Sequence, residues 1–245
     1  MRPFTMNVVQ DMREQNVLAL EHAKRDNRKV VGMYCAFAPQ ELALAAGAIP
    51  VSLCGTRHEP IAAAEKTLPR NLCPLIKSSF GFAITDTCPY FRLSDFIVAE
   101  TTCDGKKKMF EILREYKPIH MMHLPQGTDR PAAVTWWLKE LKILKERLEE
   151  NLGVEITRQN LRGAIKLCNR ERLVMKRLHE MNRLDPAPLA GLDMLTAIWM
   201  KGFNVDKEDG INQINQLIGE IEEIAASGQS PFRPGTPRVL LTGCP

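Results

Sequence analysis

The chain has 245 residues, of which 25% are charged and 44% are hydrophobic, and its net charge is +4. This profile is typical of a globular protein with one large domain or two small ones. The net charge is too small to indicate nucleic-acid binding by itself, and no apolar run approaches the roughly 20 residues of a membrane span. The N-terminal residues also lack the apolar segment of a signal peptide. We therefore expect a cytoplasmic protein without a membrane anchor or a nucleic-acid partner.

Short β-rich runs alternate with helical patterns in the first half of the chain. The sequence predicts strands at 30–35, 49–53, 95–99 and 119–124, and helices at 39–47, 74–85 and 106–116. This alternation is typical of an α/β fold with a doubly wound parallel sheet, as in Rossmann and flavodoxin-like domains. In such sheets ligands bind beyond the carboxyl ends of the strands, at the point where the strand order reverses.

The sequence changes in character from residue 131 onward. Leu- and Ile-periodic, heavily charged segments predict amphipathic helices at 131–150, 157–182, 189–201 and 207–226. The alternation of Arg, Lys and Glu on these helices favours a solvated face over a binding surface. A Pro- and Gly-rich connector then leads to Arg238-Val-Leu-Leu-Thr-Gly-Cys-Pro, which is typical of the first strand of a further α/β domain.

These patterns predict three parts. They are an N-terminal α/β domain (1–130), a helical subdomain (131–230), and a linker with the first strand of a second α/β domain (231–245). A lone strand has no neighbour to pair with, so we expect the chain to be the N-terminal part of a longer protein.

Seven cysteines are the unusual feature of the composition. Their odd number and the absence of a signal peptide argue against a disulfide framework, and no Cys-x-x-Cys or His-x-x-x-His pattern supports a zinc site. Each cysteine taken alone is explained as well by a role as a small buried hydrophobe. As a group, however, several lie in loop-forming contexts, because Cys73, Cys88 and Cys244 precede proline and Cys103 precedes Asp-Gly.

The positions of three cysteines relative to the predicted strands point to a shared site. Cys35, Cys54 and Cys103 each follow the carboxyl end of a predicted strand, and these ends meet at one edge of a parallel sheet. Thiolates on loops at such an edge suit an iron–sulfur cluster whose ligands come from distant parts of the chain.

Three segments resemble a known family. They are Cys35-Ala-Phe-Ala-Pro-Gln-Glu-Leu with Ala46-Gly-Ala-Ile-Pro, Cys73-Pro-Leu-Ile-Lys-Ser-Ser, and Thr102-Cys-Asp-Gly-Lys-Lys-Lys. They resemble the 2-hydroxyacyl-CoA dehydratase D-component family, whose members are similar to 2-hydroxyglutaryl-CoA dehydratase and benzoyl-CoA reductase. Within this family, the segments resemble the branch of double-cubane-cluster proteins more closely. The resemblance covers essentially the whole chain.

This resemblance implies a fold, a cofactor and a partner. It implies two α/β domains around a helical region, with a 4Fe-4S cluster or a double-cubane 8Fe-9S cluster in the cleft between them. It also implies an ATP-hydrolysing iron–sulfur activator protein as electron donor, and a homodimer or heterodimer. In the dehydratases of this family one electron turns the thioester carbonyl of an acyl-CoA into a ketyl radical, whereas the double-cubane branch reduces small molecules.

The same resemblance assigns roles to individual cysteines. Cys73 and Cys103 match the two cluster ligands of the family's N-terminal domain, and a third ligand lies in the C-terminal domain. Cys88, Cys35 and Cys244 resemble the extra cysteine ligands that a double cubane needs. Cys54 is then expected to be a buried wall residue and Cys168 a structural one. Because the third ligand lies outside this chain, we expect the chain to be inactive alone and its cluster to be incomplete or absent.

Polar residues beside the cysteines are further candidates. Lys106 opens a basic triplet in the first turn of a predicted helix, where positive charge opposes the helix dipole. It is a candidate for holding an anionic cluster, although a solvated helix start explains it as well. Lys77, Ser78 and Ser79 lie in the first turns of another predicted helix and are candidates for binding cluster sulfurs or a substrate oxyanion, with ordinary helix-start chemistry as the alternative. Glu41 is a candidate for proton transfer or simply favours its helix dipole.

Three functional hypotheses follow. The first is an iron–sulfur component of an ATP-activator-dependent, low-potential reductase, and the number of loop cysteines favours it. The second is an (R)-2-hydroxyacyl-CoA dehydratase subunit that acts through a ketyl radical, and the third is a non-catalytic, thiol-rich α/β binding protein. No Gly-x-Gly-x-x-Gly or Gly-x-x-x-x-Gly-Lys-Ser/Thr motif occurs, so any ATP is used by a partner. The expected substrate is a small molecule or an acyl-CoA.

Overall fold

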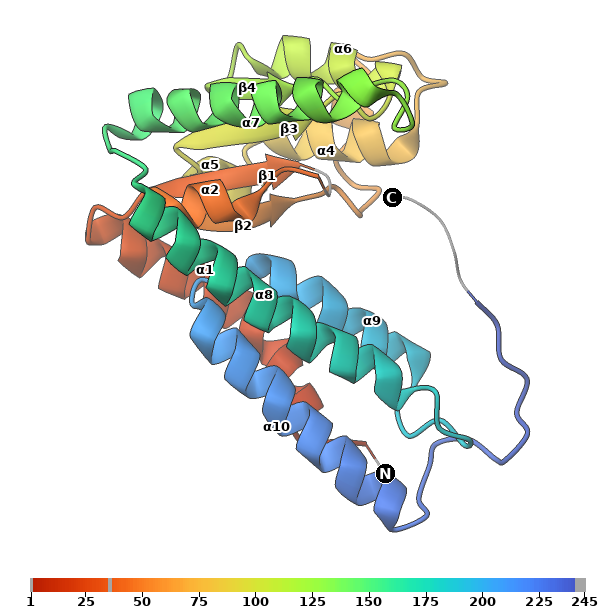
Figure 1. Ribbon diagram of the computed structural model, residues 1–245. Coiled ribbons are helices and arrows are strands. Elements are labelled where there is room, and N and C mark those ends of the chain that lie inside the picture. The colour runs from red at the N-terminus through yellow and green to blue at the C-terminus, as the bar shows by residue number, and fades with distance from the viewer. Residues whose placement is uncertain (1, 35–36, 241–245) are drawn as a thin grey trace. The chain divides into compact units, whose positions relative to one another are not determined.

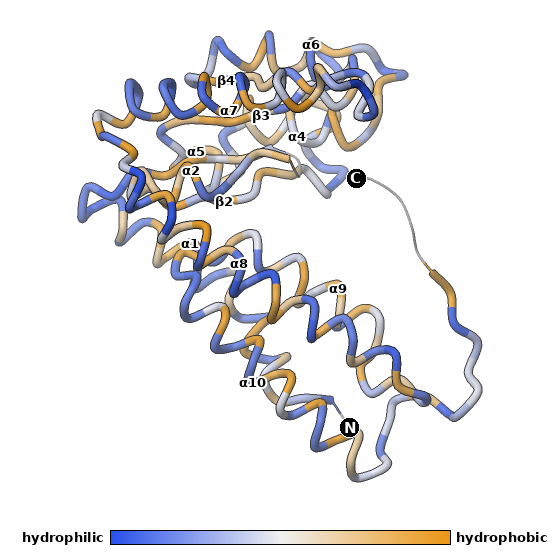
Figure 2. Tube along the Cα trace, viewed as in Figure 1, coloured by the Kyte–Doolittle hydropathy of each residue, from blue (hydrophilic) through white to orange (hydrophobic). Residues whose placement is uncertain are grey.

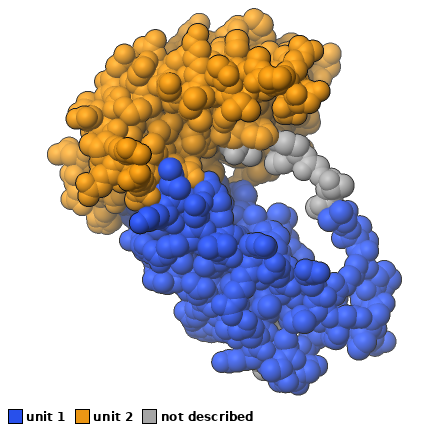
Figure 3. All heavy atoms as spheres, viewed as in Figure 1, with its two compact units in different colours: residues 1–19, 165–244 blue, residues 20–164, 245 orange. Residues whose placement is uncertain are grey.

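A computed structural model describes residues 2–34 and 37–240 of the chain. The described residues divide into two compact units (Figure 3). One unit holds residues 20–164, and the other holds residues 2–19 together with 165–240. We call them the α/β unit and the helical unit. No helix in the described part of the chain is both long and apolar enough to cross a membrane.

The sheet of the α/β unit is parallel, with the strand order β2-β1-β3-β4 (Figure 1). Its strands are β1 (Val30–Tyr34), β2 (Ile49–Leu53), β3 (Phe96–Glu100) and β4 (Ile119–Met122). Nearly all residues of β1, β2 and β3 are buried, as expected for parallel strands covered on both faces. The predicted α/β fold with a parallel sheet is confirmed.

The strand order reverses between β1 and β3. After β1 the chain forms β2 on one side and then crosses over to form β3 on the other. The ligand-binding crevice of a doubly wound sheet lies at this reversal, beyond the carboxyl ends of the two strands. In this chain the described residues that follow these ends are 37–39 after β1 and 101–103 after β3.

Helices cover both faces of the sheet. The complete helices of the α/β unit are α2 (Gln40–Ala45), α3 (Ile61–Ala64), α4 (Pro74–Ile84), α5 (Pro89–Leu93), α6 (Asp104–Leu113) and α7 (Pro131–Leu152). On one face, Leu42 of α2 and Leu148 of α7 share a core with Val31 and Val98 of the sheet. On the other face α6 packs against β1, where the rings of Phe110 and Tyr34 lie 5.2 Å apart between centroids.

The compact units divide the chain differently from the boundary expected at residues 130 and 131. Helix α7, expected in the helical subdomain, belongs to the α/β unit, because Leu144, Leu148 and Leu152 pack against the sheet. Conversely, the first part of helix α1 (Thr5–Arg25), which was not predicted from the sequence, belongs to the helical unit. The apolar periodicity of an amphipathic helix shows that it has a buried face but not which partner buries it.

The helical unit is built from the first part of α1 and from three helices that lie much later in the chain. These are α8 (Arg158–Met181), whose first turns belong to the α/β unit, α9 (Gly191–Met200) with a short 3-10 turn (Lys201–Phe203), and α10 (Lys207–Ala226). Figure 2 shows hydrophobic and hydrophilic residues alternating along α8 and α10. Their apolar faces, with those of α1 and α9, form a separate core that includes Met6, Leu178, Ala197, Leu217 and Ile221.

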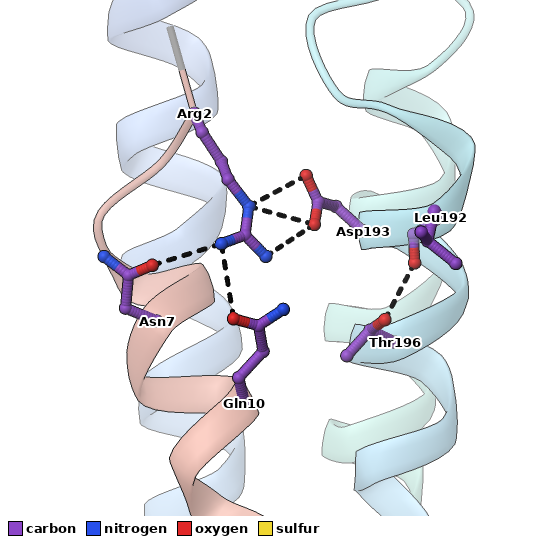
Figure 4. Close-up of polar contacts among 6 residues, drawn as sticks. All are labelled: Arg2, Asn7, Gln10, Leu192, Asp193 and Thr196. Atoms are coloured by element: carbon purple, nitrogen blue, oxygen red, sulfur yellow. Dashed lines mark hydrogen bonds and ion pairs between the residues drawn. The ribbon is translucent and has the colours of Figure 1, made fainter.

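A polar cluster joins the start of the chain to α9 within the helical unit (Figure 4). The guanidinium group of Arg2 donates to the carboxylate of Asp193 at 2.7 Å and to the side-chain oxygens of Asn7 and Gln10. This paired geometry is the favourable one for an arginine and a carboxylate. It fixes the residues before α1 against the first turn of α9.

Residues 231–240 contain no helix or strand. The strand expected near the end of the chain therefore has no counterpart at residues 238–240, and its remainder, residues 241–245, lies outside the described residues. The guanidinium group of Arg238 donates to the backbone carbonyls of Asn182 and Leu184, just beyond α8.

Candidate functional site

Three of the predicted ligand cysteines occupy the same local position, the N-cap of a helix. Cys73 precedes α4, Cys88 precedes α5 and Cys103 precedes α6. The sulfur of Cys103 accepts a hydrogen bond from the backbone amide of Lys106 at 3.4 Å. A side chain at the N-cap lies beside backbone amides that lack a partner within the helix, so these amides are available to donate to a sulfur atom.

Cys73 and Cys103 are both exposed, and their helices begin side by side. Gly105, in the first turn of α6, lies against the residues that flank Cys73. A Cβ atom at Gly105 would be 2.9 Å from the side chains of both Leu72 and Ile76. The two cysteines that match the family's ligands therefore cap adjoining helices near the carboxyl end of β3, at the edge where the sequence predicted the site.

Cys88 lies at the other end of α4. The 11 residues of α4 separate it from Cys73, which corresponds to about 16 Å along the helix axis. Burial raises the pKa of the Cys88 thiol, against the opposing effect of hydrogen bonds from the amides of Phe91 and Tyr90. The geometry thus does not bring Cys88 beside Cys73 and Cys103, and it favours the thiol over the thiolate.

The remaining cysteines are differently placed. Cys35 and Cys244 lie outside the described residues, so their assignment as ligands stays a prediction. Cys54 follows β2 and is exposed, so the expectation that it is a buried wall residue was wrong. Cys168 is fully buried in the helical unit, in agreement with a structural role.

Ser78 and Ser79 fasten the loop after β2 to α4. The hydroxyl oxygen of Ser79 accepts from the amide of Gly55 at 2.9 Å, and the hydroxyl of Ser78 donates to the carbonyl of Arg57 at 2.6 Å. Both serines are buried, and they are the fifth and sixth residues of α4, beyond the amides that lack a helical partner. Their polar groups are therefore engaged within the chain, and a role toward a ligand stays a prediction.

Lys77 is also buried and engaged within the chain. Its ammonium group donates to the carboxylate of Glu65 and to the carbonyl of Arg70, each at 2.7 Å. The hydrogen bond from Lys77 lowers the pKa of Glu65. Lys77 thereby anchors the segment that leads into Cys73, and a contact between Lys77 and a cofactor stays a prediction.

The other charged candidates lie at helix starts. Lys106, the third residue of α6, is partly exposed and contacts Cys103 through its amide. The two lysines after it pair with Asp104 and Glu111 of the same helix, which offsets part of the unfavourable charge at the helix start. Glu41, the second residue of α2, is partly buried.

One residue at this edge, Glu100, was not predicted from the sequence. It is the last residue of β3 and has no exposed surface, and its carboxylate accepts a hydrogen bond from the amide of Ala38. Burial raises the pKa of Glu100, while the amides of Ala38 and Phe37 and the charge of Lys106 act in the opposite direction. A charged residue that ends the apolar run Phe-Ile-Val-Ala-Glu was the signal that could have identified it.

The donor set partly fits the cluster that the resemblance implies. Two exposed thiols at adjoining helix N-termini are soft ligands of the kind that bind iron–sulfur clusters. Among the described residues, no group of three Cys, His, Asp or Glu side chains is positioned to hold a metal ion. Cys73 and Cys103 are therefore suited to be part of a ligand set that other residues complete.

The fold and this cysteine pair define an α/β protein with a thiol site at the carboxyl edge of its sheet. The sequence profile of the family described as 2-hydroxyglutaryl-CoA dehydratase, D-component, matches residues 35–245. The chain belongs to this family, so the resemblance predicted from its motifs is confirmed.

Several curated proteins are similar to the chain. It is 44% identical to the putative dehydratase subunit YjiM of Escherichia coli, over 99% of the chain and 63% of that protein. It is 25% identical to the (R)-phenyllactyl-CoA dehydratase beta subunit of Clostridium sporogenes, over 91% of the chain and 58% of that protein. It is 21% identical to a subunit of the benzoyl-CoA reductase of Thauera aromatica, over 69% of the chain and 44% of that protein. The chain thus spans between 44% and 63% of the length of these relatives.

Proposed function

We propose that the protein is an iron–sulfur component of a low-potential reductase of this family, with Cys73 and Cys103 as two of the cluster ligands. The observation that carries the proposal is that these two exposed cysteines cap adjoining helices at the carboxyl edge of the sheet. The cluster is a 4Fe-4S cubane or a double-cubane 8Fe-9S cluster, and the remaining ligands include Cys35, Cys244 or residues from the rest of the protein.

The chain's own groups prepare the two thiols for this role. Both cysteines lie at helix N-termini, and the amide of Lys106 donates to the sulfur of Cys103. The packing of Gly105 on Leu72 and Ile76 sets the separation of the two helix starts. A cluster held by these thiolates would supply single electrons at low potential.

The partners follow from the chemistry and from the relatives. The family resemblance implies an ATP-hydrolysing iron–sulfur activator protein as the electron donor, and the chain itself has no phosphate-binding Gly-rich motif. Several relatives are named as subunits of enzymes that act on acyl-CoA thioesters, which supports a subunit role, in a homodimer or heterodimer, and an acyl-CoA or another small molecule as substrate.

A dehydratase subunit is the second candidate. The names of three relatives, (R)-phenyllactyl-CoA, lactoyl-CoA and (R)-2-hydroxyglutaryl-CoA dehydratase, favour it. This candidate predicts turnover of a 2-hydroxyacyl-CoA through a ketyl radical, and protection of the protein by acyl-CoA. The full-length protein with an intact cluster is assayed with 2-hydroxyacyl-CoA substrates. If it turns over none of them, the dehydratase candidate is excluded and the reductase remains.

The cluster assignment is tested by iron and sulfide analysis and EPR of the full-length protein purified without oxygen. Cys73→Ala and Cys103→Ala should each lose most of the bound iron, because each removes one thiolate ligand. Cys168→Ala is the matched control and should retain the wild-type iron content, since Cys168 is buried in the other unit. Iron-free wild-type protein that takes up no cluster on reconstitution would contradict the proposal and favour a thiol-rich binding protein.

A further inference from the structure

Glu100 places a carboxyl group at a position where a charge is costly. It ends β3, has no exposed surface and lies three residues before Cys103. A carboxylate in such surroundings destabilises the fold unless hydrogen-bond donors surround it. We therefore expect contacts of Glu100 that offset the cost of its burial.

Those contacts come from the segment that follows β1. One oxygen of Glu100 accepts from the amide of Ala38, and the amide of Phe37 also favours the charged form. The other oxygen, Oε2, has no hydrogen-bond partner among the described residues. Because β1 and β3 are neighbouring parallel strands, this side chain bridges the two segments that border the point where the strand order reverses.

Backbone amides that leave a strand need an acceptor. In this segment Phe37 is 56% exposed, whereas Ala38 packs against the edge of the hydrophobic core. A second glutamate in the unit makes the same kind of contact elsewhere. Glu140 of α7 is buried, and its Oε2 accepts from the amide of His123, in the segment after β4, at 2.9 Å. Glu140 thus supplies a matched comparison at the edge strand of the described sheet.

We propose that Glu100 is a positioning residue: its buried carboxyl group clamps the segment after β1 to the carboxyl end of β3 and so sets the spacing of the two segments that border the candidate site. Its relevance to a cluster rests on the function proposed above. The clamp itself does not rest on that function, because it is a contact within the chain and can be measured without a bound cluster.

The clamp is tested by residue-resolved hydrogen exchange of the cluster-free, full-length protein. Glu100→Ala should lower the protection of the Phe37 and Ala38 amides by about tenfold or more, because the carboxyl oxygen that accepts from this segment is lost. Glu100→Gln keeps an acceptor oxygen and should restore most of the protection. Glu100→Asp keeps the carboxyl group but shortens the side chain, so it should behave like Glu100→Ala and serves as the test where the alanine variant does not fold.

Glu140→Ala is the control and should expose the amide of His123 while leaving Phe37 and Ala38 protected. The proposal is overturned by unchanged protection in Glu100→Ala or Glu100→Asp, or by an equal loss in Glu140→Ala. In the cluster-loaded protein, Glu100→Ala should lose iron to a chelator faster than wild type, and Glu100→Gln should restore the wild-type rate. If the wild type binds no iron, the proposed function fails while the exchange result still decides the clamp.

Discussion

Two titratable side chains, the buried Glu100 and the half-buried His120, show how strongly single residues depend on their surroundings. Oε2 of Glu100 and Nε2 of His120 are buried without a hydrogen-bond partner among the described residues. Burial raises the pKa of Glu100 and lowers the pKa of His120. Both shifts favour the neutral form, because a poorly solvated environment penalises charge.

The lowered pKa of His120 predicts a pH-dependent stability. Burial lowers this pKa in the folded state, more than Glu140 raises it, so the unfolded chain binds more protons once the pH falls below about 6.5. The free energy of unfolding should therefore decrease as the pH falls from about 7 toward 5. The decrease should be on the order of 1 kcal/mol or less, because solvent screens the partly exposed ring. Urea titrations of wild type and His120→Phe across this range measure the effect.

His120→Phe should flatten the pH dependence, because it removes the titrating group. At pH 8, where the imidazole is neutral in both states, the two proteins should differ only by a constant packing contribution. An identical pH dependence in the variant would show that His120 does not carry the effect.

At the scale of elements, the bounds of the longer helices that the sequence predicted were better predicted than the elements that these helices pack against. The Cys-Pro pair at residues 73 and 74 predicted the start of α4, because proline is favoured in the first turn. Gly47 was predicted to end α2, and it adopts the left-handed φ of +74° that glycine tolerates. The short helices α3 and α5 were missed, since four or five residues show no periodicity.

The contacts between elements depend on glycines whose role the sequence does not reveal. A Cβ atom at Gly55 would overlap the backbone nitrogen of Ser79, so the loop after β2 rests directly on α4. Gly55→Ala should therefore destabilise the protein by about 1–3 kcal/mol, because backbone cannot move aside as a flexible side chain can. Thermal or urea unfolding measures the change.

Gly163→Ala is the matched control for that substitution. Gly163 lies inside α8, and a Cβ atom added there would have no neighbouring atom within 4 Å, so alanine should stabilise the helix by about 0.5–1 kcal/mol. A Gly55→Ala variant that is as stable as wild type would mean that the loop does not pack on α4 as closely as the structure shows.

Within the described residues, each compact unit contains a hydrophobic core of its own. The helical core encloses an ion pair: the ammonium group of Lys207 donates to Glu171 at 2.9 Å, and both side chains are nearly fully buried. Removing Lys207 would leave the buried Glu171 with only the longer contact to Lys201, at 3.8 Å. Losing most of the compensation of a buried charge is far more costly than losing an exposed pair.

Lys207→Met should destabilise the helical unit by about 3–5 kcal/mol. Because each unit has its own core, hydrogen exchange should show lost protection in α10 and in the later turns of α8, while β1 and β3 keep theirs. The control Arg170→Ala removes an exposed pair with Glu208 and should cost about 0–1 kcal/mol. Equal loss of protection in both units would contradict the independence of the two cores.

The sequence by itself determined the parallel α/β fold, the family and the two cysteines that cap α4 and α6, because strand and helix periodicities, cap residues and short motifs are local signals. Only the tertiary structure decided that α7 packs on the sheet, that Cys88 lies at the far end of α4, and that Lys77 and Ser78 bind their own chain. It also decided that Glu100 is buried beside the segment after β1. These are contacts between residues far apart in the chain, and local patterns do not encode which surfaces meet.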